Sequence, residues 1–142
     1  GLLAAVAVMS LTNVRARARD TKRLQDLKSL ATALDSYGNE FPNLQLEDCT
    51  QGRRLYLCKI PPAAAALPIK LENIKDPIKD TPPCHQQSDR ACEYAVANNA
   101  LTPGNYEICF RLETDQPSLG KSGVNSLKTG GFIERACSYI VQ

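Results

Sequence analysis

The first nine residues are wholly apolar, and no glycine or proline interrupts the chain across residues 2–37. At about 1.5 Å per residue, a helix over this stretch is roughly 50 Å long, far longer than a domain of this size needs to cover its own core. The apolar tip alone reaches about 14 Å, well short of the ~30 Å needed to span a bilayer. We therefore expect the tip to be buried against something outside its own domain.

The predicted helix has three zones of different polarity. Residues 1–11 are apolar on all sides, and residues 12–23 are polar and basic. Residues 24–37 carry a one-sided apolar stripe at helical spacing, formed by Leu24, Leu27, Leu30, Ala31, Leu34 and Tyr37. Because only this last zone needs a globular body to pack on, we expect residues 1–23 to protrude.

The chain is predicted to divide after Tyr37. Gly38 and Asn39 form the predicted left-handed C-cap of the helix, and Pro42 prevents the helix from resuming early. The length of 142 residues favours one domain with a separate helical stalk. We therefore predict a stalk over residues 1–37 and a globular head over residues 38–142.

The first part of the head is predicted to be mostly loop. Six of the nine prolines lie between Pro61 and Pro83, and proline-rich sequence disfavours regular structure over residues 39–90. A single helical turn is predicted at residues 63–66, where four alanines follow Pro62.

Alternating apolar and polar residues predict antiparallel strands in the second part of the head. A hairpin is predicted over residues 92–97 and 106–113, with a third strand within residues 131–141. Residues 114–130 are rich in Gly, Ser, Lys and Pro, which favours an exposed loop. A long helix packed on a small antiparallel sheet gives an α+β fold.

The six cysteines indicate disulfide bonds formed in an oxidising compartment, because none of them belongs to a C-x-x-C pair. Fifteen pairings are possible. Pairing of cysteines that are close in the sequence favours Cys49–Cys58 and Cys84–Cys92, because these bridges close short loops. Cys109 and Cys137 are then left for the third bridge. Strict alternation places Cys109 opposite Phe110, so we expect its bridge to lie outside the main core.

The charge pattern favours no strongly polyanionic partner, since the net charge is +2. A basic cluster on the predicted helix consists of Arg15, Arg17, Arg19, Lys22 and Arg23. We interpret it as a solvated or inter-subunit polar face, with a nucleic-acid or anionic-lipid site as the alternative. Nucleic acid is the less favoured partner because Asp20 and Asp26 dilute the cluster and no aromatic residue interleaves it.

No active site, metal or cofactor is predicted, and we do not expect an enzyme. His85 is the single histidine, and the cysteine spacing fits no zinc site. Asp76, Asp80 and Asp89 match no calcium-binding loop and are interpreted as solvated carboxylates.

The N-terminal features together resemble the type IV pilin family. Residues 1–8 look like the second half of the family's hydrophobic N-terminal segment, and residues 15–30 resemble its continuation in pilins and in secretion pseudopilins. Residues 34–42, Leu-Asp-Ser-Tyr-Gly-Asn-Glu-Phe-Pro, resemble the usual end of the helix. The family's prepilin-peptidase site and its N-terminal glutamate lie upstream of Gly1, so we expect the chain to be a mature or trimmed form.

The resemblance is weaker in the head. Asp76-Pro77 and the segments 93–95 and 106–113 resemble parts of the family's head domain, and a Cys109–Cys137 bridge would resemble its disulfide-bounded C-terminal region. The family usually has a helix-breaking proline where this chain has Met9, so we expect the helix to be continuous here.

The resemblance implies a structural subunit of an extracellular type IV pilus on the cell surface. Such subunits form a helical homopolymer by bundling their apolar helices, after residence in the cytoplasmic membrane and with the help of a pilus assembly machinery. The residues expected to make the bundle contacts are Leu2, Leu3, Val6, Val8 and Met9. The driving ATPase must be another protein, because the chain has no phosphate-binding loop.

Two other functions remain open from the sequence. The nearest is a type II secretion pseudopilin, and the other is a secreted binding module that uses the basic helix or exposed loops. The sequence does not distinguish twitching, adhesion and DNA uptake as the use of a pilus.

Overall fold

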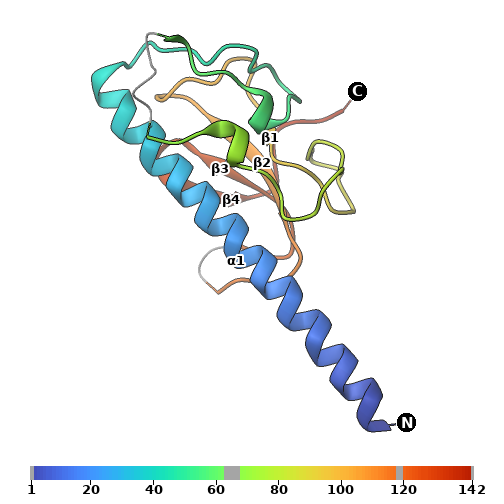
Figure 1. Ribbon diagram of the computed structural model, residues 1–142. Helices are drawn as coiled ribbons and strands as arrows, with labels where there is room; N and C mark the ends of the chain where they lie inside the picture. Colours follow the sequence, from blue (N-terminus) through green and yellow to red (C-terminus); the bar gives the residue numbers. More distant parts are fainter. Residues whose placement is uncertain (1, 63–67, 118–119, 142) are drawn as a thin grey trace.

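A computed structural model describes residues 2–62, 68–117 and 120–141, with the side chains of residues 2–10 left out. Helix α1 (Leu2–Glu40) is one continuous helix, as the unbroken sequence predicts. Its N-terminal part projects well beyond the rest of the molecule, and its C-terminal part lies along the head (Figure 1).

The predicted helix end is wrong by one turn. Helix α1 continues through Gly38 to Glu40, and Phe41 N donates to Tyr37 O at 2.9 Å. Gly38 is needed for close approach instead of a left-handed cap, because a Cβ there would lie 3.0 Å from Cβ of Pro103.

The head contains a four-stranded antiparallel sheet in the order β1-β2-β3-β4. The strands are β1 (Ala95–Val96), β2 (Glu107–Leu112), β3 (Gly123–Lys128) and β4 (Phe132–Arg135). Among the described residues, three short 3₁₀ turns accompany them, η1 (Leu55–Leu57), η3 (Leu71–Asn73) and η4 (Thr129–Gly131). Helix and sheet together confirm the α+β class.

The predicted strands are only partly right. Strand β2 is confirmed, β4 lies within the predicted third strand, and β1 is shorter than predicted. The predicted loop over residues 114–130 is wrong, because it contains β3, an interior strand paired to β2 and β4. The segment before the sheet is mostly irregular, as expected, whereas the turn predicted at residues 63–66 lies outside the described residues.

The main core lies between α1 and the sheet. All six residues of the predicted apolar stripe are buried there or at its edge, which confirms the packing face of the helix. The sheet contributes Ile108, Phe110, Leu112 and Leu127 to the same core. The helix therefore stays on the head by burial of apolar surface.

A second, smaller cluster is separate from the main core and contains Cys84, Cys92, Ala95, Ala97, Cys109 and Cys137. Cys109 therefore lies outside the main core, as predicted from its alternation with Phe110, but it is fully buried instead of standing on a polar face.

All six cysteines are paired, as Cys49–Cys58, Cys84–Cys92 and Cys109–Cys137, with Cα–Cα distances of 4.8, 4.9 and 5.4 Å. This confirms the pairing favoured by loop length. Three disulfides in a chain of this size indicate an oxidising compartment outside the cytosol.

Within the described residues, no helix combines the length and the apolarity needed to cross a bilayer.

Candidate functional site at the junction of helix and head

The residues predicted to make assembly contacts lie in the projecting part of α1. Leu2, Leu3, Val6, Val8 and Met9 have helical backbone, but their side chains lie outside the described residues. The next apolar side chains along the helix are described, and both are exposed, Leu11 at 53% and Val14 at 60%. They are three residues apart and so share a helix face. The described part of the projecting helix therefore exposes apolar surface at Leu11 and Val14.

The projecting part ends earlier than predicted. Residues 1–23 were expected to protrude, but Asp20 is 0% exposed and Arg23 is 1% exposed. Both side chains form ion pairs with residues of the head. These pairs compensate the burial of their charges, so a charged stretch of the helix can pack against the head. We call the group of buried Asp20, Arg23 and Asp76 and half-buried Arg19 and Glu113 the ionic junction.

Arg23 is the centre of the ionic junction. Its guanidinium donates to both carboxylate oxygens of Asp76, from Nε at 2.6 Å and from Nη2 at 2.9 Å. Its Nη1 donates to Asp20 Oδ1 and to Glu113 Oε1, both at 2.7 Å. Burial opposes the charge of Arg23, but the hydrogen bonds and charges of its partners outweigh burial and raise its pKa.

Glu113 follows strand β2 and is shared by two arginines. Arg19 Nε donates to Glu113 Oε1 at 2.8 Å, and Arg23 approaches the same oxygen. The hydrogen bond from Arg19 is the largest cause of a fall in the pKa of Glu113 to about 2, with burial opposing and Arg23 adding to the fall. Glu113 is therefore ionised at neutral pH.

Asp20 fixes the end of β2 through backbone hydrogen bonds. Its carboxylate accepts from Glu113 N at 3.0 Å, Thr114 N at 2.8 Å and Thr114 Oγ1 at 2.8 Å. Together with the bond from Arg23, these donors compensate the burial of the charge.

Asp76 connects the junction to the chain before the sheet. Its backbone N donates to Glu93 Oε1 at 2.7 Å, and the same Glu93 oxygen accepts from Tyr94 N at 3.0 Å. Burial is the main cause of a raised pKa for Glu93. The junction thus ties α1 to the Asp76 loop, to the residues before β1 and to the end of β2.

The sequence contained a signal for the ionic junction that the analysis of apolar residues missed. Asp20 and Arg23 precede Leu24 and Leu27 by four residues each, so they continue the buried stripe by one turn. Their partners Asp76 and Glu113 lie far away in the sequence, and spacing alone did not identify them.

The predicted basic cluster is divided by the junction. Arg19 and Arg23 are engaged in ion pairs with the head, and Lys22 pairs with Asp26 at 2.6 Å. Arg15 and Arg17 are exposed on the projecting helix. The cluster is therefore not one continuous basic face.

The candidate metal ligands are used in other ways. The interpretation of Asp76 as a solvated carboxylate is wrong, because Asp76 is buried and both of its oxygens bind Arg23. Asp80 and Asp89 are exposed, as expected. Cys84, the neighbour of His85, belongs to a disulfide. Glu107 lies close to the sulfurs of Cys109 and Cys137, but these sulfurs are bonded to each other and offer no thiolate. The arrangement of the ionic junction suits it to holding the helix in a fixed direction.

Comparisons of the chain with known protein families, with curated proteins and with solved structures found no match. The resemblance to type IV pilins therefore rests on the amino-acid sequence alone.

Proposed function

We propose that this chain is a structural subunit of an extracellular type IV pilus and has no catalytic activity. The observation that carries the proposal is the projecting part of α1, which is continuous with the packed helix and extends beyond a disulfide-bonded head (Figure 1). Leu11 and Val14 are exposed on it and follow the apolar residues 1–9 of the sequence, and a contiguous apolar surface on a projecting helix supports a partner that covers it.

In this proposal the partner is a second copy of the chain. The apolar helices of neighbouring copies bundle in the filament centre, and the heads form the outer wall. Leu2, Leu3, Val6, Val8 and Met9 make the bundle contacts. Burial of each large side chain contributes about 1.5–3 kcal/mol, so a few residues per copy drive assembly. The cytoplasmic membrane covers the same surface before assembly, and a separate assembly machinery supplies the energy for extraction.

The ionic junction gives each copy a defined geometry. A bundle forms in register only if every helix leaves its head in the same direction. The bidentate hydrogen bond from Arg23 to Asp76 depends on the orientation of the two groups, whereas apolar packing does not. The junction also lies where a pulling force on the helix would pass into the head.

The experiment is Val6→Asp in the gene returned to its own host, with electron microscopy of the cell surface and head-specific antibodies. We expect loss of fibres with a normally folded head, because a carboxylate in a dry helical bundle is costly to bury. Gln25→Asp is the matched control, since Gln25 is an exposed residue of the same helix and a charge there should leave fibres intact.

Normal fibres from the Val6→Asp variant would overturn the bundle model. Wild-type protein that stays monomeric with its apolar tip present would favour a secreted binding module. Assemblies that remain short and require Ca²⁺ would favour a secretion pseudopilin.

A further inference from the structure

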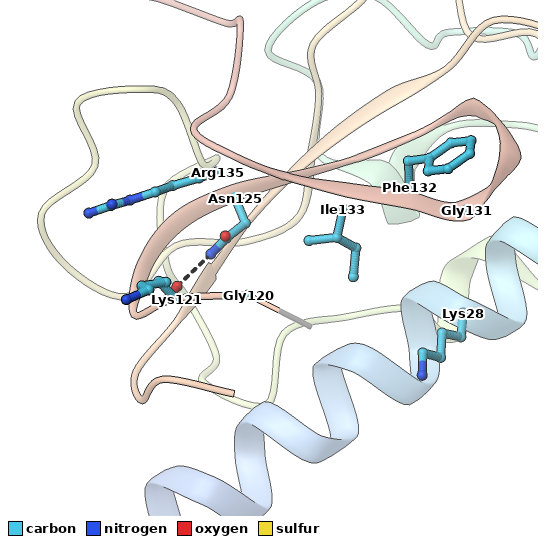
Figure 2. Close-up of a pocket in the computed structure, with 8 residues that line it drawn as sticks. All are labelled: Lys28, Gly120, Lys121, Asn125, Gly131, Phe132, Ile133 and Arg135. Carbon is cyan, nitrogen blue, oxygen red and sulfur yellow. Dashed lines mark hydrogen bonds between the residues drawn. The ribbon is translucent and has the colours of Figure 1, made fainter. Parts of the chain in front are cut away.

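A pocket of about 480 Å³ lies between α1 and the β3–β4 edge of the sheet (Figure 2). Three cationic side chains from separate elements line it: Lys28 on α1, Lys121 before β3 and Arg135 on β4. Figure 2 shows Ile133 projecting from β4 into the space that faces α1. The volume is within the usual range for small-molecule sites.

The three cations form no ion pair within the part of the chain that the structure describes. None of them takes part in an ion pair among the described residues, and no acidic side chain lines the pocket. The charges of Lys121 and Arg135 reach the carboxylate of Asp115, whose pKa is lowered first by the backbone hydrogen bond from Ser122 and also by these two charges. Three cations and one carboxylate leave the pocket with a positive potential.

The segment that carries Lys121 is held in place. Asn125 is 0% exposed, and its Nδ2 donates to Lys121 O at 2.8 Å and to Gly123 O at 2.9 Å. The residue opposite Asn125 on the neighbouring strand is Arg135. The backbone that carries Lys121 and Arg135 is therefore held in place. This lowers the entropic cost of ordering the two side chains around an anion.

We propose that this pocket binds a small molecule with a carboxylate or phosphate group and an apolar substituent. Ammonium and guanidinium groups form charge-assisted hydrogen bonds with anionic oxygens. Ile133 offers apolar surface between Lys28 on α1 and the pair Lys121 and Arg135 (Figure 2). Asp115 acts as a competing internal anion and lowers the affinity for the ligand. The site is independent of the projecting helix and of the filament proposal.

The test is an NMR titration of the ¹⁵N-labelled full chain with phenyl phosphate. Lys121→Gln and Arg135→Gln should each weaken binding about three- to fivefold, which is the usual value of one exposed charge pair. Asp115→Asn should strengthen binding by a similar factor, because the amide still accepts the bond from Ser122 but no longer competes for the cations. Lys79→Gln is the control, since Lys79 is an exposed lysine that does not line the pocket.

Equal weakening by Lys79→Gln, or no gain from Asp115→Asn, would show diffuse surface attraction and would overturn the site. Inorganic phosphate and phosphatidylglycerol vesicles separate the possible sources of the anion. We expect inorganic phosphate to bind more weakly than phenyl phosphate. Equal affinity would contradict the role of Ile133, and binding only to vesicles would contradict a small-molecule pocket.

Discussion

Two adjacent stretches of α1 attach to the same head by different means. Residues 19–23 attach through the ionic junction, where Arg23 meets three carboxylates within 2.6–2.9 Å. Residues 24–37 attach through the apolar stripe, with Leu27, Leu30 and Leu34 fully buried. The two stretches share a helix face, so they differ mainly in the chemistry of contact.

The difference separates stability from direction. Apolar contact stabilises in proportion to the area buried and tolerates small shifts, whereas a buried ion pair gains little net free energy after desolvation. Removing one member of such a pair is nevertheless costly, because a charge stays buried without compensation. The apolar stripe therefore holds the helix on the head, and the ionic junction fixes the direction in which it leaves.

The largest effect is expected from Arg23→Ala. Asp20 and Asp76 would stay buried without their cation, so we expect a loss of about 3–5 kcal/mol in the free energy of unfolding. Urea denaturation followed by circular dichroism, with the disulfides intact, measures the loss. Arg23→Lys should cost nearly as much, since an ammonium cannot reproduce the two-pronged bond. A loss below about 1 kcal/mol for Arg23→Ala would mean that the ion pairs are solvated in solution.

A somewhat smaller effect is expected from Leu27→Ala. Leu27 is 0% exposed, and truncation of a buried leucine costs about 2–4 kcal/mol through lost transfer energy and a cavity. Leu27→Met should cost less than about 1.5 kcal/mol, because apolar packing accepts a residue of similar volume. If Leu27→Met lowered the free energy of unfolding as much as Arg23→Lys, the apolar stripe would not tolerate substitution better than the ionic junction does.

Acid should weaken the ionic junction before it affects the apolar stripe. Glu113 has a folded pKa of about 2, below its unfolded value, so its contribution is complete above about pH 4.5 and is lost as the pH falls toward 2. We expect about 1–2 kcal/mol after allowing for solvent screening. Glu93 acts in the opposite sense, because its raised pKa favours the folded state once it is protonated.

Urea denaturation at a series of pH values measures this dependence, and Glu113→Gln should flatten it. If the free energy of unfolding depended on pH in the same way in Glu113→Gln, the acid sensitivity would come from other carboxylates.

The sequence predicted the parts of the molecule that follow from local pattern. Helical spacing identified the buried face of α1, and alternation identified β2. Short loop lengths identified the bridges Cys49–Cys58 and Cys84–Cys92. Each of these depends on residues close together in the chain, whose type reveals their burial directly.

The parts that sequence analysis missed depend on partners far away in the chain. Strand β3 reads Gly-Val-Asn-Ser-Leu-Lys, and its buried Asn125 and Ser126 hide the alternation of an interior strand. Asp20 and Arg23 read as a solvated face, because their burial is favourable only beside Asp76 and Glu113. A polar residue at a buried position can be recognised only when its partner is known.

The smallest effect is expected one residue away from the largest, at Lys22→Ala. Lys22 pairs with Asp26 at 2.6 Å, as close as Arg23 to Asp76, but its side chain is 53% exposed. An exposed pair four residues apart on a helix contributes about 0.5 kcal/mol or less, and a lysine placed before the acid is the weaker order. The same urea experiment should therefore show a change below about 0.5 kcal/mol. The two pairs match in distance and both cations lie on the same helix, so the difference between them measures burial together with the additional carboxylates that Arg23 binds. A large loss at Lys22 would show that charge pairing itself, not its burial, anchors this part of the helix.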